Sequence, residues 1–357
     1  SFRCVAVAGA RAGPVVFALS VCPMPSPSSA SPQAAITSVG HYLPETRLTN
    51  GDLEEMVETS DEWIRTRTGI QERRILGDDG KATAFMATAA AQEALDSRGI
   101  EPDAVDLIVV ATVTPDMLFP ATACLVQDNL GASNAWGFDL SAACSGFIYA
   151  LTTGAQFIET GQAETVLVIG ADKMSSIVDY TDRTTCILFG DAAGAVVLEA
   201  DEEAGLHDAV HHVDGEHSEL LRMRGGGSLN PPTHETVDAH MHYLQQEGRQ
   251  VFKLAVNRMA NVCREVLDRN GLDAAGVDYL VPHQANQRII DATAKRMGLS
   301  SDQVMMNIDR YGNTTAATIP LCLFDWEDEL QRGDELILTA FGGGFTWGAG
   351  HLTWAYD

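Results

Sequence analysis

The chain reads Glu93-Ala-Leu-Asp-Ser-Arg-Gly-Ile-Glu-Pro-Asp-Ala-Val-Asp-Leu-Ile-Val109 in its first half and, 172 residues later, Glu265-Val-Leu-Asp-Arg-Asn-Gly-Leu-Asp-Ala-Ala-Gly-Val-Asp-Tyr-Leu-Val281. Seven of the seventeen aligned positions are identical, and most of the others are similar. Each copy contains the end of a helix, a glycine that stops it, a loop and an apolar run typical of a buried strand. The period is too long for a solenoid, so the sequence predicts a duplicated domain.

Strand-like and helical runs alternate on both sides of these copies, from Ala35 to the C-terminus. Alternation of this kind favours an α/β fold whose strands are buried and mostly parallel. We place one half at residues 34–204 and the other at 205–357, and we expect an active site between them. The expected strands are residues 106–112, 136–140, 165–170, 193–199, 277–282, 304–308 and 335–341.

The first 33 residues differ in composition from the rest of the chain. Residues 1–22 are rich in Ala and Val, and residues 23–32 form a Pro/Ser run that contains Met24. Such a stretch cannot build a hydrophobic core. We therefore expect residues 1–33 to be a disordered extension, or the native chain to start at Met24. A secretion signal is disfavoured because the apolar part is short and lies late.

Charge and cysteine content exclude several classes of function. With 23 Lys and Arg against 49 Asp and Glu, the formal charge of -26 argues against sequence-independent binding of nucleic acid or anionic membranes. Seven dispersed cysteines without a CxxC pair argue against a disulfide framework or a zinc site, and fit a reducing cytoplasm. Only four of the basic residues are lysine, and this acidic, lysine-poor composition suggests adaptation to high salt.

A candidate nucleophile lies at a predicted turn from strand to helix. The segment is Asp139-Leu-Ser-Ala-Ala-Cys144-Ser-Gly-Phe, in which small residues permit a tight turn and Cys144 opens an apolar helix. Unpaired N–H groups and the positive end of the helix dipole favour a thiolate there, so we expect a thiol pKa below the free value of ~8.5. The alternative is an inert buried cysteine, which is the commoner fate of this residue type.

Three segments of the second half could complete a site with this cysteine. His283 directly follows the repeated strand, and Asn313 lies at a turn that corresponds to the Cys144 turn. The strand end Phe341-Gly-Gly-Gly-Phe-Thr-Trp-Gly348 offers backbone N–H groups to an oxyanion, and it lacks the Gly-Lys-Ser/Thr of a phosphate loop. Taken singly, a structural histidine and a helix-capping asparagine also explain the first two residues.

These segments belong to a larger set of motifs that is spread along the chain. The set comprises Thr59-Ser-Asp-Glu-Trp63-Ile, Arg67-Thr-Gly-Ile, Ala142-Ala-Cys144-Ser-Gly-Phe, Phe189-Gly-Asp-Ala-Ala-Gly194-Ala, Val251-Phe-Lys253, His283-Gln-Ala-Asn286-Gln-Arg288-Ile-Ile, Tyr311-Gly-Asn313-Thr-Thr and Gly342-Gly-Gly-Phe-Thr-Trp-Gly348. It resembles the thiolase-like condensing enzymes, and among them the β-ketoacyl-acyl-carrier-protein synthase III family. The resemblance implies two duplicated halves in αβαβα layers with mixed, mostly parallel sheets. Two departures, Ala192 for the usual Gly and Thr315 for the frequent Ser, touch no reacting group.

The resemblance implies an acyltransferase that condenses acetyl-CoA with malonyl-acyl carrier protein to acetoacetyl-acyl carrier protein, CoA and CO2. This step initiates type II fatty-acid synthesis. Cys144 would hold the acetyl group as a thioester, while His283 and Asn313 would donate to the enolate formed on decarboxylation. The backbone N–H groups of Cys144 and Gly343 would hold the oxyanion. No cofactor is implied beyond the CoA thioesters that serve as substrates.

The resemblance also assigns the substrate contacts. Trp63 and Arg183 would sandwich the CoA adenine, and Arg67 would help at its phosphates. An ordinary core aromatic is the alternative for Trp63. The acyl pocket would contain Phe119, Phe189 and Phe341. Phe119 would reach in from a partner subunit, which implies a homodimer and a short primer.

Scarce basic residues coincide with family positions that dock the acyl carrier protein. Lys253 and Lys295 are two of only four lysines, and Arg288 and Arg296 lie near them in the sequence. A solvated helix face explains basic residues in general, but it does not explain why scarce lysines fall here. We therefore expect this group to dock the acidic carrier despite the net charge of -26.

Seven of the ten histidines lie between His207 and His242. Their spacings match no usual ligand pattern, so we expect no metal. Two other functions stay open on the sequence. One is a specialised relative that starts a polyketide or joins other acyl chains, and the other is a catalytically silent scaffold that binds acyl-CoA.

Overall fold

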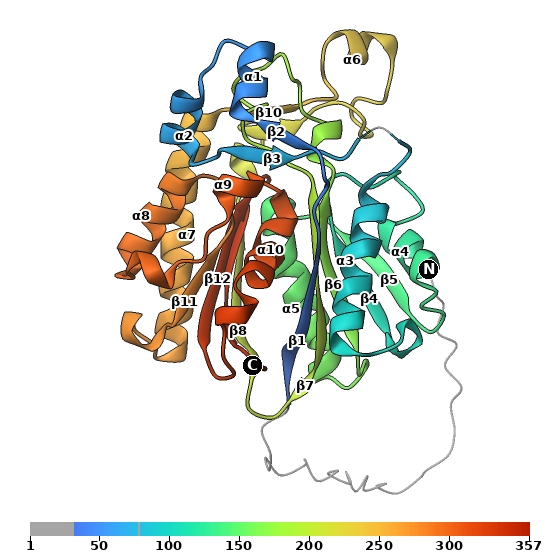
Figure 1. Ribbon diagram of the computed structural model, residues 1–357, viewed down its shortest axis with the longest axis vertical. Helices are drawn as coiled ribbons and strands as arrows, with labels where there is room; N and C mark the ends of the chain where they lie inside the picture. The colour runs from blue at the N-terminus through green and yellow to red at the C-terminus, as the bar shows by residue number, and fades with distance from the viewer. Residues whose placement is uncertain (1–31, 78) are drawn as a thin grey trace, which may run out of the picture. The chain divides into compact units, whose positions relative to one another are not determined.

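The computed structural model describes residues 32–77 and 79–357 (Figure 1). Its first half is built on a five-stranded sheet with the strand order β1-β7-β6-β4-β5. β7 runs antiparallel to both of its neighbours, so the other four strands point the same way. The central strands are buried apolar runs, as expected of a sheet covered on both faces. The bounds are β1 (Gln33–Tyr42), β4 (Leu107–Ala111), β5 (Trp136–Leu140), β6 (Val166–Asp172) and β7 (Ala192–Asp201).

The second half repeats this arrangement. Its four-stranded sheet has the order β11-β12-β13-β8, and β13 runs antiparallel to both of its neighbours. β1 begins at Gln33 and β8 at Gly205, which is the same offset of 172 residues as between the two similar segments. The predicted duplication and the mixed, mostly parallel sheets are thereby confirmed. The bounds are β8 (Gly205–Val213), β11 (Tyr279–Pro282), β12 (Glu335–Gly342) and β13 (Thr346–Thr353).

Helices complete the layers. α3 (Thr83–Arg98) and α4 (Thr122–Leu130) pack on the first sheet, and α7 (Gly248–Asn270) and α8 (Gln287–Met297) lie on the side of the second (Figure 1). α5 (Gly146–Glu159) contacts strands of both sheets. α10 (Thr318–Asp325) likewise contacts β1 and β7 of the first sheet and β11 of the second. The largest apolar cluster joins residues of both sheets to these two central helices, so the αβαβα layering is held by one shared core.

The remaining helices and strands of the described residues are short. They are β2 (Arg47–Thr49), α1 (Asn50–Met56), α2 (Asp61–Thr68), β3 (Glu72–Arg74), β9 (Leu221–Met223), α6 (His234–Asp238), β10 (Leu244–Gln246) and α9 (Ile308–Tyr311). In the described part of the chain, every helix is too short or too polar to cross a bilayer.

Two expectations about the elements need correction. The strand predicted at residues 304–308 does not form, because Val304 makes only an isolated bridge to Leu280 and Ile308 already begins α9. The predicted extension of residues 1–33 lies outside the described residues up to residue 31, but Gln33 belongs to β1, where it pairs with Asp201.

Candidate active site

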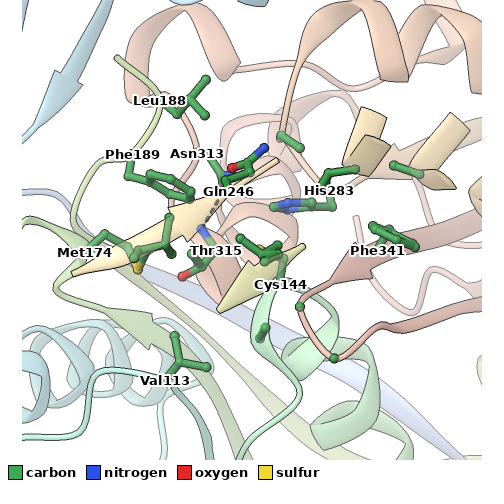
Figure 2. A pocket seen from close by; sticks show the side chains of 18 of the residues that line it. Val113, Cys144, Met174, Leu188, Phe189, Gln246, His283, Asn313, Thr315 and Phe341 are labelled. Carbon is green, nitrogen blue, oxygen red and sulfur yellow. Dashed lines mark hydrogen bonds between the residues drawn. The ribbon is translucent and has the colours of Figure 1, made fainter. Parts of the chain in front are cut away.

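A cavity of about 570 Å³ opens where segments of the two halves meet. Cys144 of the first half and His283 and Asn313 of the second half all line it, and Figure 2 shows their side chains around one space. Cys144 follows β5, and His283 follows β11. The site therefore uses loops at the carboxyl ends of strands, where ligands of α/β sheets usually bind.

The turn at Cys144 is tight. Ala143 has a φ of 48°, and Cys144 lies in the 3-10 turn Ala143–Ser145 that leads into α5. β12 packs directly behind this turn, since a Cβ added to Gly342 would lie 2.7 Å from the Cys144 backbone nitrogen. Only glycine permits this approach, which fixes the position of the nucleophile relative to the second half.

The ionisation of Cys144 differs from the expectation. Burial, and after it the negative charge of Asp172, raise the pKa of the Cys144 thiol to about 12, while a backbone hydrogen bond opposes the shift. The predicted lowering of this pKa by the helix N-terminus is therefore wrong. The reason is that desolvation of a fully buried thiolate outweighs the favourable N–H groups.

His283 is buried, and its Nδ1 lies 2.7 Å from the Thr318 hydroxyl oxygen. Burial lowers the pKa of His283 to about 3, so the ring is neutral at physiological pH. The Thr318 hydroxyl lies 3.0 Å from the Thr315 carbonyl oxygen as well, and its single proton can go to only one of these two acceptors. In the tautomer with its proton on Nε2, the Thr318 hydroxyl donates to Nδ1 and Nε2–H is left for a ligand. Thr318 was not identified from the sequence, although it lies in the same Thr/Ala-rich run as Asn313.

Asn313 is held by backbone bonds to the first half. Its N–H donates to the Leu188 carbonyl at 2.9 Å, and its carbonyl accepts from the Gly190 N–H at 3.1 Å. The side-chain Oδ1 accepts from the Thr315 N–H at 2.9 Å (Figure 2), so the expectation that Thr315 touches no reacting group is wrong. Because the amide oxygen is occupied, the Asn313 NH2 group is the part of this side chain that remains to donate to a ligand.

The residues predicted for the oxyanion and the acyl chain separate into two groups. Gly343, Phe189 and Phe341 line the cavity (Figure 2 labels the two Phe side chains). Phe119 does not line the cavity of its own chain, and its side chain is 85% exposed beside exposed Met117 and Leu118. Sequence reasoning also missed several apolar lining residues, among them Met174, Leu188, Phe252 and Met259.

The three residues predicted to contact CoA lie together near the cavity mouth. The guanidinium carbons of Arg67 and Arg183 lie 4.7 Å and 5.6 Å from the Trp63 ring centroid. Asn286, which lines the cavity, donates to the Arg67 carbonyl at 2.9 Å. Trp63 is half-buried, and its contacts with both guanidinium groups are of the cation–π type.

The four residues predicted to dock the carrier are exposed on two adjacent helices, α7 and α8. Arg288 stacks over the ring of Phe252, which lines the cavity, with 5.1 Å from its guanidinium carbon to the ring centroid. Arg296 instead turns toward α7 and donates to the Asn257 side chain at 2.9 Å. Lys253 and Lys295 complete this group, which we call the basic helix pair.

The histidine-rich segment forms separate polar contacts. His207 lies 2.7 Å from Thr353, His211 2.9 Å from Thr152, and His212 2.8 Å from Glu265. His240 pairs with Asp179 at 3.0 Å. Among residues 32–77 and 79–357, no three His, Cys, Asp or Glu side chains are grouped so that they could hold a metal ion.

Comparisons with known proteins agree with the geometry. Residues 138–215 match the family model of 3-oxoacyl-[acyl-carrier-protein] synthase III, and residues 267–354 match the model of its C-terminal part. A beta-ketoacyl-[acyl-carrier-protein] synthase III of Chlorobaculum tepidum is 60% identical over 327 residues, which cover 90% of this chain and 99% of that protein.

Solved structures are similar over the same span. The crystal structure of 3-oxoacyl-[acyl-carrier-protein] synthase III from Aquifex aeolicus is 46% identical, with a TM-score of 0.83, and the match covers 90% of this chain and 100% of that one. The priming β-ketosynthase of the R1128 polyketide pathway is 32% identical, with a TM-score of 0.85, and the match covers 92% of this chain and 98% of that one.

Proposed function

This chain belongs to the β-ketoacyl-acyl-carrier-protein synthase III family, and from that premise we propose that it condenses acetyl-CoA with malonyl-acyl carrier protein. The observation that carries the proposal is the convergence of Cys144, His283 and Asn313 on one cavity within a chain 60% identical to a named synthase. The products are acetoacetyl-acyl carrier protein, CoA and CO2. The enzyme is an acyltransferase of fatty-acid synthesis.

The first half-reaction acetylates Cys144. Its Sγ attacks the thioester carbon of acetyl-CoA, the bond from that carbon to the CoA sulfur breaks, and the thiol proton ends on the departing CoA. The carbonyl oxygen becomes an oxyanion as the tetrahedral intermediate forms. The backbone N–H groups of Cys144 and Gly343 are the donors for it, and one such donor is typically worth ~3 kcal/mol.

The second half-reaction forms the carbon–carbon bond. Malonyl-acyl carrier protein loses CO2, and the electron pair of the broken bond becomes an enolate. Nε2–H of neutral His283 and the free NH2 group of Asn313 donate to the enolate oxygen. Two neutral donors suit a developing anion, since neither has to lose a proton and neither repels the charge. The enolate carbon then attacks the acetyl carbon, the bond from that carbon to Sγ breaks, and Cys144 leaves as a thiolate that takes up a proton from solvent.

The remaining assignments concern substrates and assembly. Trp63 and Arg183 bind the CoA adenine between them, and Arg67 contacts its phosphates. The basic helix pair docks the acidic carrier beside the cavity. Exposed Phe119 enters the acyl pocket of a second copy, so the enzyme works as a homodimer in the cytoplasm. No cofactor takes part beyond the thioester substrates.

Mass spectrometry of product and intact enzyme tests this proposal. We expect acetoacetyl-acyl carrier protein and an acetyl adduct on Cys144 after mixing with both substrates. His283→Ala and Asn313→Ala should still form the adduct, with CO2 release slowed about 10²- to 10³-fold, which is the usual cost of losing such a donor. If either variant loses acetylation while retaining decarboxylation, the assignment of roles is wrong.

A specialised condensing enzyme is the second candidate, because a polyketide priming synthase has the same fold at 32% identity. The greater identity to the fatty-acid enzymes, 60% for one of them, favours the first candidate. A panel of acyl-CoA primers separates the two. Preference for acetyl-CoA supports fatty-acid initiation, and preference for a longer or branched primer supports the specialised enzyme.

A further inference from the structure

A buried carboxylate lies behind the site and takes no part in the chemistry described so far. Asp172 is the last residue of β6 and is fully buried. Its Oδ1 accepts four hydrogen bonds from the loop that follows β4. The donors are the Thr112 hydroxyl at 3.0 Å, the Val113 N–H at 2.8 Å, the Thr114 N–H at 3.2 Å and the Thr114 hydroxyl at 2.9 Å.

The other carboxylate oxygen faces the second half of the molecule. Oδ2 accepts from the Thr315 hydroxyl and from the Ala316 N–H, the latter at 3.4 Å. The Thr315 hydroxyl also lies 2.8 Å from the Thr314 carbonyl, but it has one proton and a carboxylate is the stronger acceptor. Asp172 therefore joins a loop of the first half to the turn that follows Asn313.

Thr315 has a conformation that needs such support. Its φ is 52°, a left-handed value that a β-branched residue rarely adopts and that costs about 1–3 kcal/mol. The corresponding residue of the first half is Ala143, again 172 residues away, with a φ of 48° directly before the nucleophile. The two halves thus carry the same unusual turn, and each turn presents one reacting side chain.

The conformation of Thr315 determines how Asn313 is presented. The Thr315 N–H occupies Oδ1 of Asn313, so the Asn313 NH2 group is left for the ligand. If Thr315 relaxed to a negative φ, this N–H would rotate and the amide of Asn313 could turn over. β6 packs closely against the turn that contains Thr315, as β12 does against the Cys144 turn, because a Cβ added to Gly170 would lie 2.3 Å from the Ala316 carbonyl oxygen.

We propose that Asp172 is a positioning residue for decarboxylation, which holds Thr315 in its left-handed conformation and thereby orients the Asn313 amide toward the enolate. This inference rests on the proposed function. Asp172 touches no substrate atom, and its effect on the Asn313 amide passes through the Thr315 hydroxyl. A shift of about 1 Å in a catalytic group can cost about 10²-fold in rate. Because Asn313 is proposed to act only on the enolate, this support is specific to the second half-reaction.

Thr315→Val and Thr315→Ser form the central pair of variants. Val keeps the branched shape and removes the hydroxyl, whereas Ser keeps the hydroxyl that Asp172 accepts. We expect Thr315→Val to slow CO2 release about 10- to 100-fold at saturating malonyl-acyl carrier protein, with its KM unchanged. The rate of Cys144 acetylation in Thr315→Val should stay within about threefold of the parent rate. Thr315→Ser should release CO2 at a rate that is also within about threefold of the parent rate.

Asp172→Asn tests the carboxylate itself, with Asp191→Asn as the matched control. Asp191 is also fully buried, and it accepts from the Leu76 N–H and the Ser175 N–H, each at 2.8 Å, but not from the Asn313 turn. Both changes should lower the melting temperature. Only Asp172→Asn should slow CO2 release more than acetylation, and the control should affect the two half-reactions equally.

The outcomes separate the inference from the function on which it rests. Three outcomes would overturn the positioning role. The first is a parental rate of CO2 release in Thr315→Val, and the second is an equal loss of that rate in Thr315→Val and Thr315→Ser. The third is a loss of acetylation that equals the loss of decarboxylation. If the parent enzyme acetylates but releases no CO2 from malonyl-acyl carrier protein, the proposed function fails and the inference fails with it. Failure of Asp172→Asn to fold leaves the decision to the two Thr315 variants.

Discussion

At the scale of single residues, burial disfavours the charged forms of both Cys144 and His283. Burial raises the pKa of the Cys144 thiol to about 12 and lowers that of His283 to about 3. Each shift penalises the charged form, as desolvation does for acids and bases alike. In the acetyl transfer proposed above, Cys144 therefore has to lose its proton during the reaction.

The pH dependence of alkylation tests this result. Because the pKa of Cys144 lies above the working pH, its thiolate fraction should rise about tenfold per pH unit. We expect the rate of Cys144 labelling by iodoacetamide to increase steadily from pH 7 to pH 10, read by peptide mass mapping. Cys144→Ala provides the background from exposed Cys124. A plateau near neutral pH would mean that the helix N-terminus prevails over burial.

At the scale of elements, the site depends on how closely strands approach turns of the other half. Gly342 of β12 is the clearest case, because its Cβ position is 2.7 Å from the Cys144 nitrogen and 2.9 Å from the Ala142 carbonyl oxygen. Both neighbours are backbone atoms, so a methyl group there cannot be accommodated by a change of side-chain conformation.

We expect Gly342→Ala to lower the free energy of unfolding by about 1–3 kcal/mol and to slow acetylation of Cys144 at least about tenfold. Gly350→Ala on β13 is the control, since its Cβ would lie 3.3 Å from the end of the flexible Leu206 side chain and 3.7 Å from the Asp208 carbonyl oxygen, an ordinary contact distance. Thermal unfolding and the rate of adduct formation measure both effects. Equal behaviour of the two variants would show that the close approach of β12 is not what positions Cys144.

The basic helix pair makes a second prediction at this scale. Lys253→Glu should raise the KM for malonyl-acyl carrier protein about tenfold while leaving the KM for acetyl-CoA unchanged, because the carrier is acidic and the CoA site proposed at Trp63 does not include Lys253. Arg264→Glu, an identical change of charge on the same helix but away from the cavity, is the control. Equal effects on both substrates, or an equal effect of the control, would contradict carrier docking at α7.

At the scale of the whole molecule, the net charge of -26 leads to a prediction about how stability depends on salt concentration. Self-repulsion of this size destabilises the compact state at low ionic strength, and the screening length falls to ~3 Å in molar salt. We therefore expect the melting temperature to rise by about 5 °C or more between low salt and molar KCl. A melting temperature that does not change with KCl would argue against adaptation to high salt.

The sequence determined the features that are local or repeated. The copies at residues 93–109 and 265–281 predicted the duplication, and the strand at residues 136–140 was predicted at its observed bounds. Cys144, His283 and Asn313 could be named because each follows a recognisable strand or turn. The prediction of a strand at residues 304–308 was wrong, because an apolar run does not reveal whether a partner strand lies beside it.

Features that depend on contacts between distant residues could not be predicted from the sequence. The pKa of Cys144 was expected from its helix N-terminus alone, whereas the folded chain buries the thiol and places Asp172 near it. Asp172 and Thr315 are 143 positions apart, so nothing local joins them. Desolvation and long-range hydrogen bonds arise only when the two halves pack, and they decide how reactive the predicted residues are.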